Sequence, residues 1–230
     1  MMSVAENVEK IEERVANACA RSGRNRDEIT LMAVTKFQEA RAVEEAWNAG
    51  IRFFGESRVQ EAAAKFDGFR ERHPGARLHF IGGLQRNKAK TAAALFDCVQ
   101  SVDRESVALE LAKHAAGRAA PLPILLEFRT GEETKSGFTG ADELFRVTEL
   151  ILGCSGLKAV GLMTMAPFTD EEAPLRSAFR RIVEMRRELE RRFPDCGNWS
   201  CLSMGMSGDF EIAVEEGSTL LRIGGAIFGG

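Results

Sequence analysis

The stretch Ile29-Thr30-Leu31-Met32-Ala33-Val34-Thr35-Lys36 is an apolar run of strand length that ends in a lysine. Further runs of this kind follow it along the chain, and segments of helical period separate them. Strands that alternate with helices in this way are typical of repeated βα units. The expected strands cover residues 30–36, 53–55, 78–81, 98–102, 124–128, 157–161, 201–204 and 220–223.

Helices are expected between these strands, and another precedes the first of them. In the segment 4–20, Val4, Val8, Ile11 and Val15 recur at the spacing of one helix face. The later helices are expected at residues 39–49, 59–66, 88–95, 105–116, 141–152, 172–193 and 209–216. The pattern predicts an α/β fold, a single (β/α)8 TIM-type barrel preceded by an N-terminal helix.

The alternative architecture is a doubly wound open sheet. A dinucleotide-binding sheet of that kind would carry a G-x-G-x-x-G motif after its first strand, and this sequence has none there. No Pro-rich or Ser-rich linker divides the chain. Residues 1–230 are therefore expected to form one barrel domain.

Composition narrows the classes of function. The 230 residues are 44% hydrophobic and 28% charged, with a formal net charge of -3, which argues against nucleic acid as the main partner. No apolar stretch approaches the roughly 18 residues that a membrane span needs. The N-terminal segment lacks the apolar core of a signal peptide, so a cytoplasmic location is expected.

Residue types with distinctive chemistry are few. The five cysteines form no C-x-x-C pair, and the three histidines lack the spacing of metal ligands, so neither a disulfide framework nor a metal site is predicted. The chain contains no tyrosine, which removes one common acid–base group from any mechanism.

Lys36 has two interpretations. Partial desolvation at the end of a buried strand would lower its pKa and produce an amine nucleophile able to form a Schiff base with a carbonyl compound. Alternatively, the side chain extends from the strand end into water and remains an ordinary ammonium group.

Glycine-rich segments follow the last two expected strands. Ser203-Met204-Gly205-Met206-Ser207-Gly208-Asp209 comes after strand seven, and Arg222-Ile223-Gly224-Gly225 ends strand eight. Loops at these positions of a (β/α)8 barrel commonly bind phosphate, although each segment also suits an ordinary helix cap or tight turn. With a lysine at the end of strand one, they suit a phosphorylated carbonyl compound such as pyridoxal 5'-phosphate (PLP).

Several segments, in order along nearly the whole chain, carry a resemblance to a known family. They are Ala33-Val34-Thr35-Lys36, Phe54-Gly55-Glu56-Ser57-Arg58-Val59-Gln60-Glu61, His79-Phe80-Ile81-Gly82-Gly83-Leu84-Gln85-Arg86-Asn87-Lys88, Gly161-Leu162-Met163-Thr164-Met165-Ala166, Leu202-Ser203-Met204-Gly205-Met206-Ser207-Gly208-Asp209, Arg222-Ile223-Gly224 and Ile227-Phe228-Gly229. Together they resemble the pyridoxal phosphate homeostasis protein family. Proteins of that family are similar in fold to the N-terminal barrel of alanine racemase.

The resemblance implies a set of cofactor contacts. Lys36 would carry PLP as an internal aldimine, and Ser207, Gly224 and Gly225 would hold its phosphate. Arg222 would face the pyridine nitrogen and keep it unprotonated, which weakens the ring as an electron sink.

Two further positions complete the expected site. Ser57 stands where the family usually has an asparagine, so it keeps a hydrogen-bonding group with a shorter reach. Met204 is expected to line the cofactor ring, although methionines near strand ends more often pack inside the barrel.

The implied function is that of a PLP-binding protein in intracellular PLP (vitamin B6) homeostasis, without efficient catalytic turnover. The alternative is a PLP-dependent enzyme such as an amino-acid racemase, or a cofactor-free Schiff-base aldolase. A two-base racemase needs a second proton carrier, which in related barrels is a tyrosine. Expected partners are PLP and PLP-dependent apo-enzymes rather than nucleic acid or membrane, and a monomer is expected.

Overall fold

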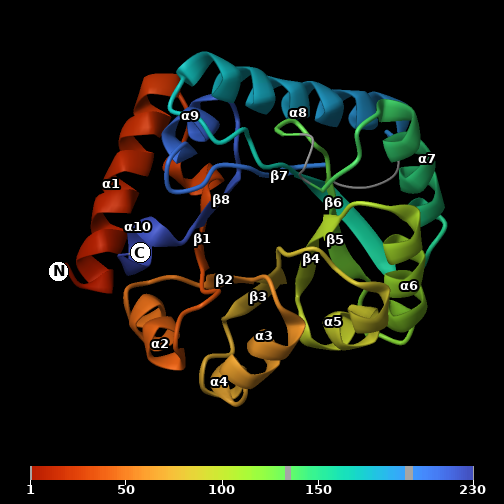
Figure 1. The fold of residues 1–230 in the computed structure, drawn as a ribbon, viewed down its shortest axis with the longest axis horizontal. Coiled ribbons are helices and arrows are strands. Elements are labelled where there is room, and N and C mark those ends of the chain that lie inside the picture. The colour runs from red at the N-terminus through yellow and green to blue at the C-terminus, as the bar shows by residue number, and fades with distance from the viewer. Residues whose placement is uncertain (1, 133–135, 195–198, 230) are drawn as a thin grey trace.

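The computed structural model describes residues 2–132, 136–194 and 199–229. Its centre is a closed barrel of parallel strands in which each strand pairs with its neighbours in chain order (Figure 1). The predicted (β/α)8 barrel is therefore confirmed. The strands are β1 (Thr30–Val34), β2 (Phe53–Glu56), β3 (Arg77–Phe80), β4 (Cys98–Val102), β5 (Leu122–Glu127), β6 (Leu157–Met163), β7 (Cys201–Ser203) and β8 (Leu220–Ile223).

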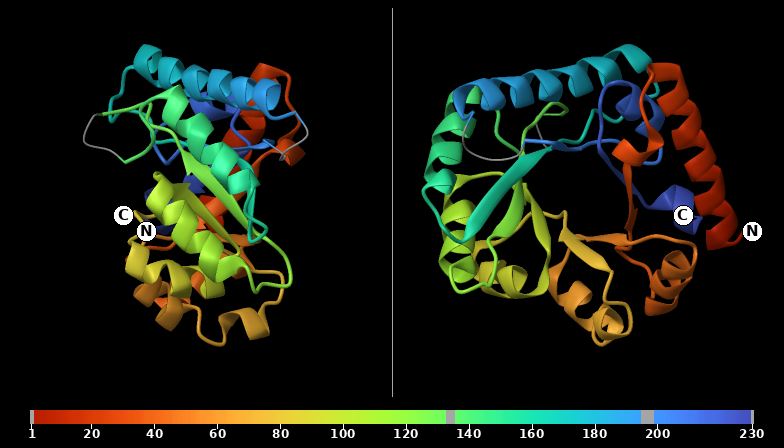
Figure 2. Two further views of the ribbon diagram at one scale, coloured as in Figure 1. Left: turned by 90° about the vertical axis from the view of Figure 1, so that its right-hand side faces the viewer. Right: turned by 180° about the vertical axis from the view of Figure 1, so that it is seen from behind.

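Helices form the outer ring around this barrel, as the views in Figures 1 and 2 show. The larger ones are α1 (Val4–Ser22), α2 (Ala40–Asn48), α3 (Val59–Lys65), α5 (Ala89–Leu95), α6 (Glu105–Ala115), α7 (Ala141–Leu152), α8 (Glu172–Arg192) and α9 (Phe210–Glu215). Shorter turns of helix are η1 (Arg26–Glu28), α4 (Phe69–Arg72), η2 (Arg86–Lys88) and α10 (Gly225–Phe228). The expected helices agree with these bounds to within a few residues.

The first and last strands close the barrel. β1 and β8 pair in register, with Met32 opposite Arg222 and Ala33 opposite Ile223. The N-terminal helix supports this closure because α1 packs against α9 and α10. The Asn7 side chain on α1 also donates a hydrogen bond to the Ile227 carbonyl oxygen at 2.9 Å. Both ends of the described chain therefore lie near one another, on the side of the barrel where β8 pairs with β1 (Figure 1).

Helix α1 forms where its sequence predicts it. A capping box at Ser3 satisfies the first backbone donors, and Gly23 in the left-handed conformation ends the helix. Its buried face carries Val8, Ile11 and Val15, the residues whose spacing predicts the helix. Burial of such a face against neighbouring helices contributes more than helix propensity does.

The strand ends differ from expectation where they matter for the site. β1 ends at Val34, so Lys36 lies in a turn beyond the strand rather than at its last residue. Phe37, next to it, adopts φ 65°, which is uncommon for a residue other than glycine. α4 and α10 are too short to produce a helical period in the sequence, and so neither is predicted.

Close strand packing at Gly161 generates a test of the barrel. A β-carbon added at Gly161 on β6 would lie 1.8 Å from the Cys201 carbonyl oxygen on β7. Gly161→Ala therefore forces the strands apart, and we expect it to lower the free energy of unfolding by about 3 kcal/mol or more. Urea titration followed by circular dichroism measures this.

Gly83→Ala is the matched control, because no atom lies within 4 Å of its added β-carbon. It should change the free energy of unfolding by less than about 1 kcal/mol. Equal stability of the two variants would contradict the close approach of β6 to β7.

Candidate functional site

The carboxyl ends of β1, β7 and β8 bring most of the predicted residues together. An added β-carbon at Gly224 would lie 3.3 Å from the Val34 carbonyl oxygen, so the start of the loop after β8 touches the end of β1. The Ala226 backbone N–H donates to the Ser207 hydroxyl at 3.2 Å, which links the loops after β7 and β8. Ser207 and Gly224 therefore belong to one connected loop cluster, which touches β1 at Val34, two residues before Lys36.

Lys36 itself is exposed. No hydrogen bond or ion pair joins it to another residue in the described part of the chain. Of the two interpretations of Lys36, this exposure agrees with a side chain that extends into water, because the chain leaves the barrel wall in the turn at Lys36 and Phe37. The side chain instead offers an unpaired primary amine at the barrel mouth.

A buried ion pair holds the residue before Lys36. The Lys65 ammonium donates to the Glu56 carboxylate at 2.8 Å and to the Thr35 carbonyl oxygen at 2.7 Å. The Thr35 hydroxyl donates to the same Glu56 oxygen at 2.7 Å. Glu56 is fully buried, and its other carboxylate oxygen has no partner among the described residues. Because both charges are shielded from water, they depend on each other and on Thr35.

Arg222 lies inside the barrel, where only 4% of the residue is exposed. Its guanidinium donates to the Ser203 hydroxyl at 2.7 Å and to the Thr164 carbonyl oxygen at 2.8 Å. Burial lowers the pKa of Arg222 to about 10, against the opposing charges of Asp209 and Glu127. It therefore remains a cation at neutral pH. A guanidinium has more N–H donors than these two contacts use, so Arg222 retains donors for a ligand.

Two buried carboxyl groups, those of Glu127 and Asp209, interact with this cation through their charge. Burial raises the pKa of Glu127 and of Asp209, while the charge of Arg222 opposes both shifts. Glu127 accepts a hydrogen bond from the Ser136 hydroxyl at 2.7 Å, and Asp209 accepts one from the Met206 backbone N–H at 2.5 Å. The hydrogen bonds of these two acids are thus made to Ser136 and Met206 and leave the Lys36 amine free for a ligand.

The other predicted residues lie in different surroundings. Ser57 is half-buried and lines a cavity of about 370 Å³ between the loops after β2 and β3, together with Gly83 and Lys88. Met204 is fully buried in the main apolar core. Gly225 is exposed at the first residue of α10.

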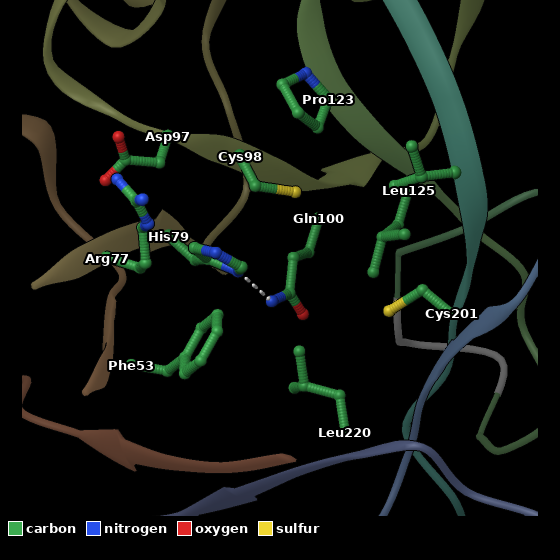
Figure 3. Close-up of a pocket in the computed structure, with 11 residues that line it drawn as sticks. Phe53, Arg77, His79, Asp97, Cys98, Gln100, Pro123, Leu125, Cys201 and Leu220 are labelled. Atoms are coloured by element: carbon green, nitrogen blue, oxygen red, sulfur yellow. Dashed lines mark hydrogen bonds between the residues drawn. The ribbon is translucent and has the colours of Figure 1, made fainter. Parts of the chain in front are cut away.

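Apart from Arg222, sequence reasoning did not identify the polar residues inside the barrel. Gln100 on β4 donates from its amide nitrogen to Nδ1 of His79 on β3 at 2.8 Å, and both are buried. Burial lowers the pKa of His79 to about 4, so the ring is neutral at pH 7. Figure 3 shows these two side chains pointing toward one another at a cavity of about 370 Å³ near the amino ends of the strands. A polar residue in the middle of an apolar strand is the signal that could have revealed them.

The arrangement at the mouth fits PLP chemically. Lys36 supplies an amine for an aldehyde, and Ser207 supplies a hydroxyl beside glycine backbone for a phosphate. Arg222 supplies spare donors for a ring nitrogen. The described residues contain no cluster of three or more metal-binding side chains, and none of their helices has the length and apolarity to cross a bilayer.

Comparison with known proteins places the chain among relatives of the same length. Residues 6–230 match the family described as the alanine racemase N-terminal domain. A pyridoxal phosphate homeostasis protein of Vibrio cholerae is 40% identical over 232 residues, which cover 100% of this chain and 97% of that protein. The chain belongs to the pyridoxal phosphate homeostasis protein family.

Solved structures agree with this family assignment. PipY of Synechococcus elongatus, in a structure with PLP bound, is 32% identical with a TM-score of 0.82, over 95% of this chain and 99% of PipY. A protein of unknown function from Bifidobacterium adolescentis is 31% identical with a TM-score of 0.90, over 98% of this chain and 94% of that one. The family barrel is therefore preserved from end to end of the described chain.

The ion pair beneath Lys36 generates a stability test. Lys65→Met leaves Glu56 buried without its countercharge, and we expect the free energy of unfolding to fall by about 3 kcal/mol. The double variant Glu56→Gln with Lys65→Met should recover part of that loss, because it buries no unpaired charge. Urea denaturation at pH 7 measures both.

Lys90→Met is the control, since Lys90 is exposed and should change stability by less than about 0.5 kcal/mol. If Lys65→Met were as stable as the Lys90 variant, the pair would not anchor the turn.

His79 generates a pH-dependent prediction. As the pH falls below about 6.5, the unfolded chain protonates this histidine, whereas the folded protein does so only near pH 4. The unfolded state then binds more protons, so the free energy of unfolding falls with falling pH, by at most about 3 kcal/mol from this residue. His79→Gln should show a flatter dependence between pH 7 and pH 4.5 in urea titrations. Parallel curves for the two proteins would contradict a neutral, buried His79.

Proposed function

We propose that this chain is a PLP-binding protein of the cytoplasm that takes part in PLP (vitamin B6) homeostasis and holds PLP on Lys36. The amine nitrogen of Lys36 attacks the PLP aldehyde carbon, a C=N bond forms, and one water molecule leaves. The observation that carries the proposal is the unpaired Lys36 amine beside the Ser207 and Gly224 loops. The PLP bound to PipY, 32% identical over nearly its whole length, supports the same occupant here.

The surrounding residues have distinct parts in the proposal. Ser207, Gly224 and Gly225 hold the phosphate through a hydroxyl and backbone N–H groups. Arg222 donates a hydrogen bond to the pyridine nitrogen. PLP when bound supplies an aldehyde and an electron-accepting ring. An arginine donor leaves the ring nitrogen unprotonated, so the capacity of the ring to accept electrons stays low.

A carrier suits these residues better than an efficient enzyme. Stereochemical inversion by two bases needs a second proton carrier opposite the lysine, and the chain contains no tyrosine for that role. The exposed position of Lys36 is compatible with passing PLP to another protein. PLP-dependent apo-enzymes are the proposed recipients.

Reduction and peptide mapping test the attachment. Purified protein incubated with PLP should gain a visible absorption band, and borohydride reduction should leave a stable adduct on the peptide that contains Lys36. Lys36→Ala should lose both the band and the adduct, whereas Lys90→Ala, which removes another exposed lysine, should retain them. A colourless wild-type protein without an adduct at Lys36 would exclude the proposal.

Turnover assays separate the carrier from an enzyme. The loaded protein should show no efficient racemization or decarboxylation of amino acids. Rapid turnover that disappears in Lys36→Ala would support a PLP enzyme in place of a carrier. Cleavage of a sugar phosphate without added PLP would instead support a cofactor-free aldolase.

A further inference from the structure

The interior of this barrel is unusually polar at mid-height. Barrel interiors of this fold are normally filled by bulky branched apolar side chains. Here His79 on β3, Gln100 on β4, Ser203 on β7 and Arg222 on β8 are all buried. Buried polar groups persist only when they are hydrogen-bonded, so the contacts among these residues account for their presence.

The four side chains form one continuous chain of hydrogen bonds. Arg222 donates to the Ser203 hydroxyl at 2.7 Å, and that hydroxyl donates to Oε1 of the Gln100 side chain at 2.6 Å. The Gln100 amide nitrogen continues the chain to Nδ1 of His79 at 2.8 Å. Strands β4 and β7 are not neighbours in the barrel, so the bond between Gln100 and Ser203 crosses its interior.

The direction of this chain follows from its cationic end. A guanidinium only donates, so Ser203 accepts from Arg222 and directs its own proton to Gln100. The Gln100 amide nitrogen also only donates, so His79 accepts at Nδ1. A neutral His79 meets this requirement, and burial keeps the ring neutral at pH 7. Each member therefore depends on the next for a partner.

The chain restricts where the Arg222 guanidinium can point. Its second contact, with the Thr164 carbonyl oxygen at 2.8 Å, lies just beyond the end of β6. One nitrogen is thus fixed by a backbone group near the mouth and the other by the side-chain network deeper in the barrel. Loss of the network would leave a long, buried cation held from one side only, beside the carboxyl groups of Asp209 and Glu127.

We propose that Gln100 and Ser203 are positioning residues: together with His79 they hold the Arg222 guanidinium in the orientation that donates a hydrogen bond to the ring nitrogen of PLP. This inference rests on the proposed function. It adds a specific role for residues that act through Arg222. It also explains why a barrel of this fold accommodates a glutamine, a serine and a histidine in its centre.

The ring nitrogen itself provides the test. PLP labelled with nitrogen-15 at that atom is bound to wild-type protein and to Ser203→Ala, Ser203→Thr and Gln100→Leu. Ser203→Ala and Gln100→Leu should shift the nitrogen resonance in the same direction and weaken PLP binding about tenfold, the effect of about one hydrogen bond. Ser203→Thr keeps a hydroxyl and should restore the wild-type resonance.

Leu125→Met is the matched control. Leu125 lines the same amino-end cavity as Gln100 but belongs to none of these hydrogen bonds (Figure 3). It should leave the resonance and the affinity unchanged. The double variant Gln100→Leu with Ser203→Ala should bind PLP about as tightly as the single variant that binds it more weakly, because both substitutions break the same chain of hydrogen bonds.

Separate outcomes distinguish this inference from the proposed function. If wild-type protein forms the Lys36 adduct but folded Ser203→Ala retains the wild-type resonance and affinity, the positioning role is overturned while the PLP site stands. If wild-type protein forms no adduct, both fail. Circular dichroism verifies folding, and Ser203→Ala decides the matter if Gln100→Leu does not fold.

Discussion

The pairing of β1 with β8 is the interaction on which the rest of this structure depends. It joins residues from opposite ends of the chain, with Met32 beside Arg222 and Ala33 beside Ile223. Without that register, the turn at Lys36 and the glycine-rich loop after β8 would not lie next to each other. Helix α1 reinforces the pairing from outside, through its packing against α9 and α10 and the hydrogen bond from Asn7 to Ile227.

The polar interior is the second constraint, and it follows from placing a cation on an inward-facing position of β8. A buried guanidinium needs partners on more than one side, and the barrel provides a backbone carbonyl on β6's end and a hydroxyl on β7. The Ser203 hydroxyl in turn donates to Gln100, and the Gln100 amide donates to His79, which extends the network across the barrel. One charged residue on β8 thus accounts for one buried polar side chain on each of β3, β4 and β7.

The strands and the larger helices could be predicted because their periodicity is a local property of the sequence. The clustering of Ser207, Gly224 and Lys36 could be expected because carboxyl strand ends share one face of a barrel. The direction of Lys36 could not, since it depends on a turn whose Phe37 adopts φ 65°. Likewise, whether Gln100 and Met204 point inward or outward depends on strand register, and a shift of one residue reverses the answer.

The exposure of Lys36 bears on how long a cargo stays bound. Hydrolysis of a Schiff base requires water at the imine carbon, and transfer to a second amine requires the same access. On the proposed function, an anchor that stands in solvent lets both reactions proceed at the pace of the chemistry itself. On that proposal such a site would load and unload readily, which would serve delivery of a reactive aldehyde, whereas an enzyme must shield its intermediates from water.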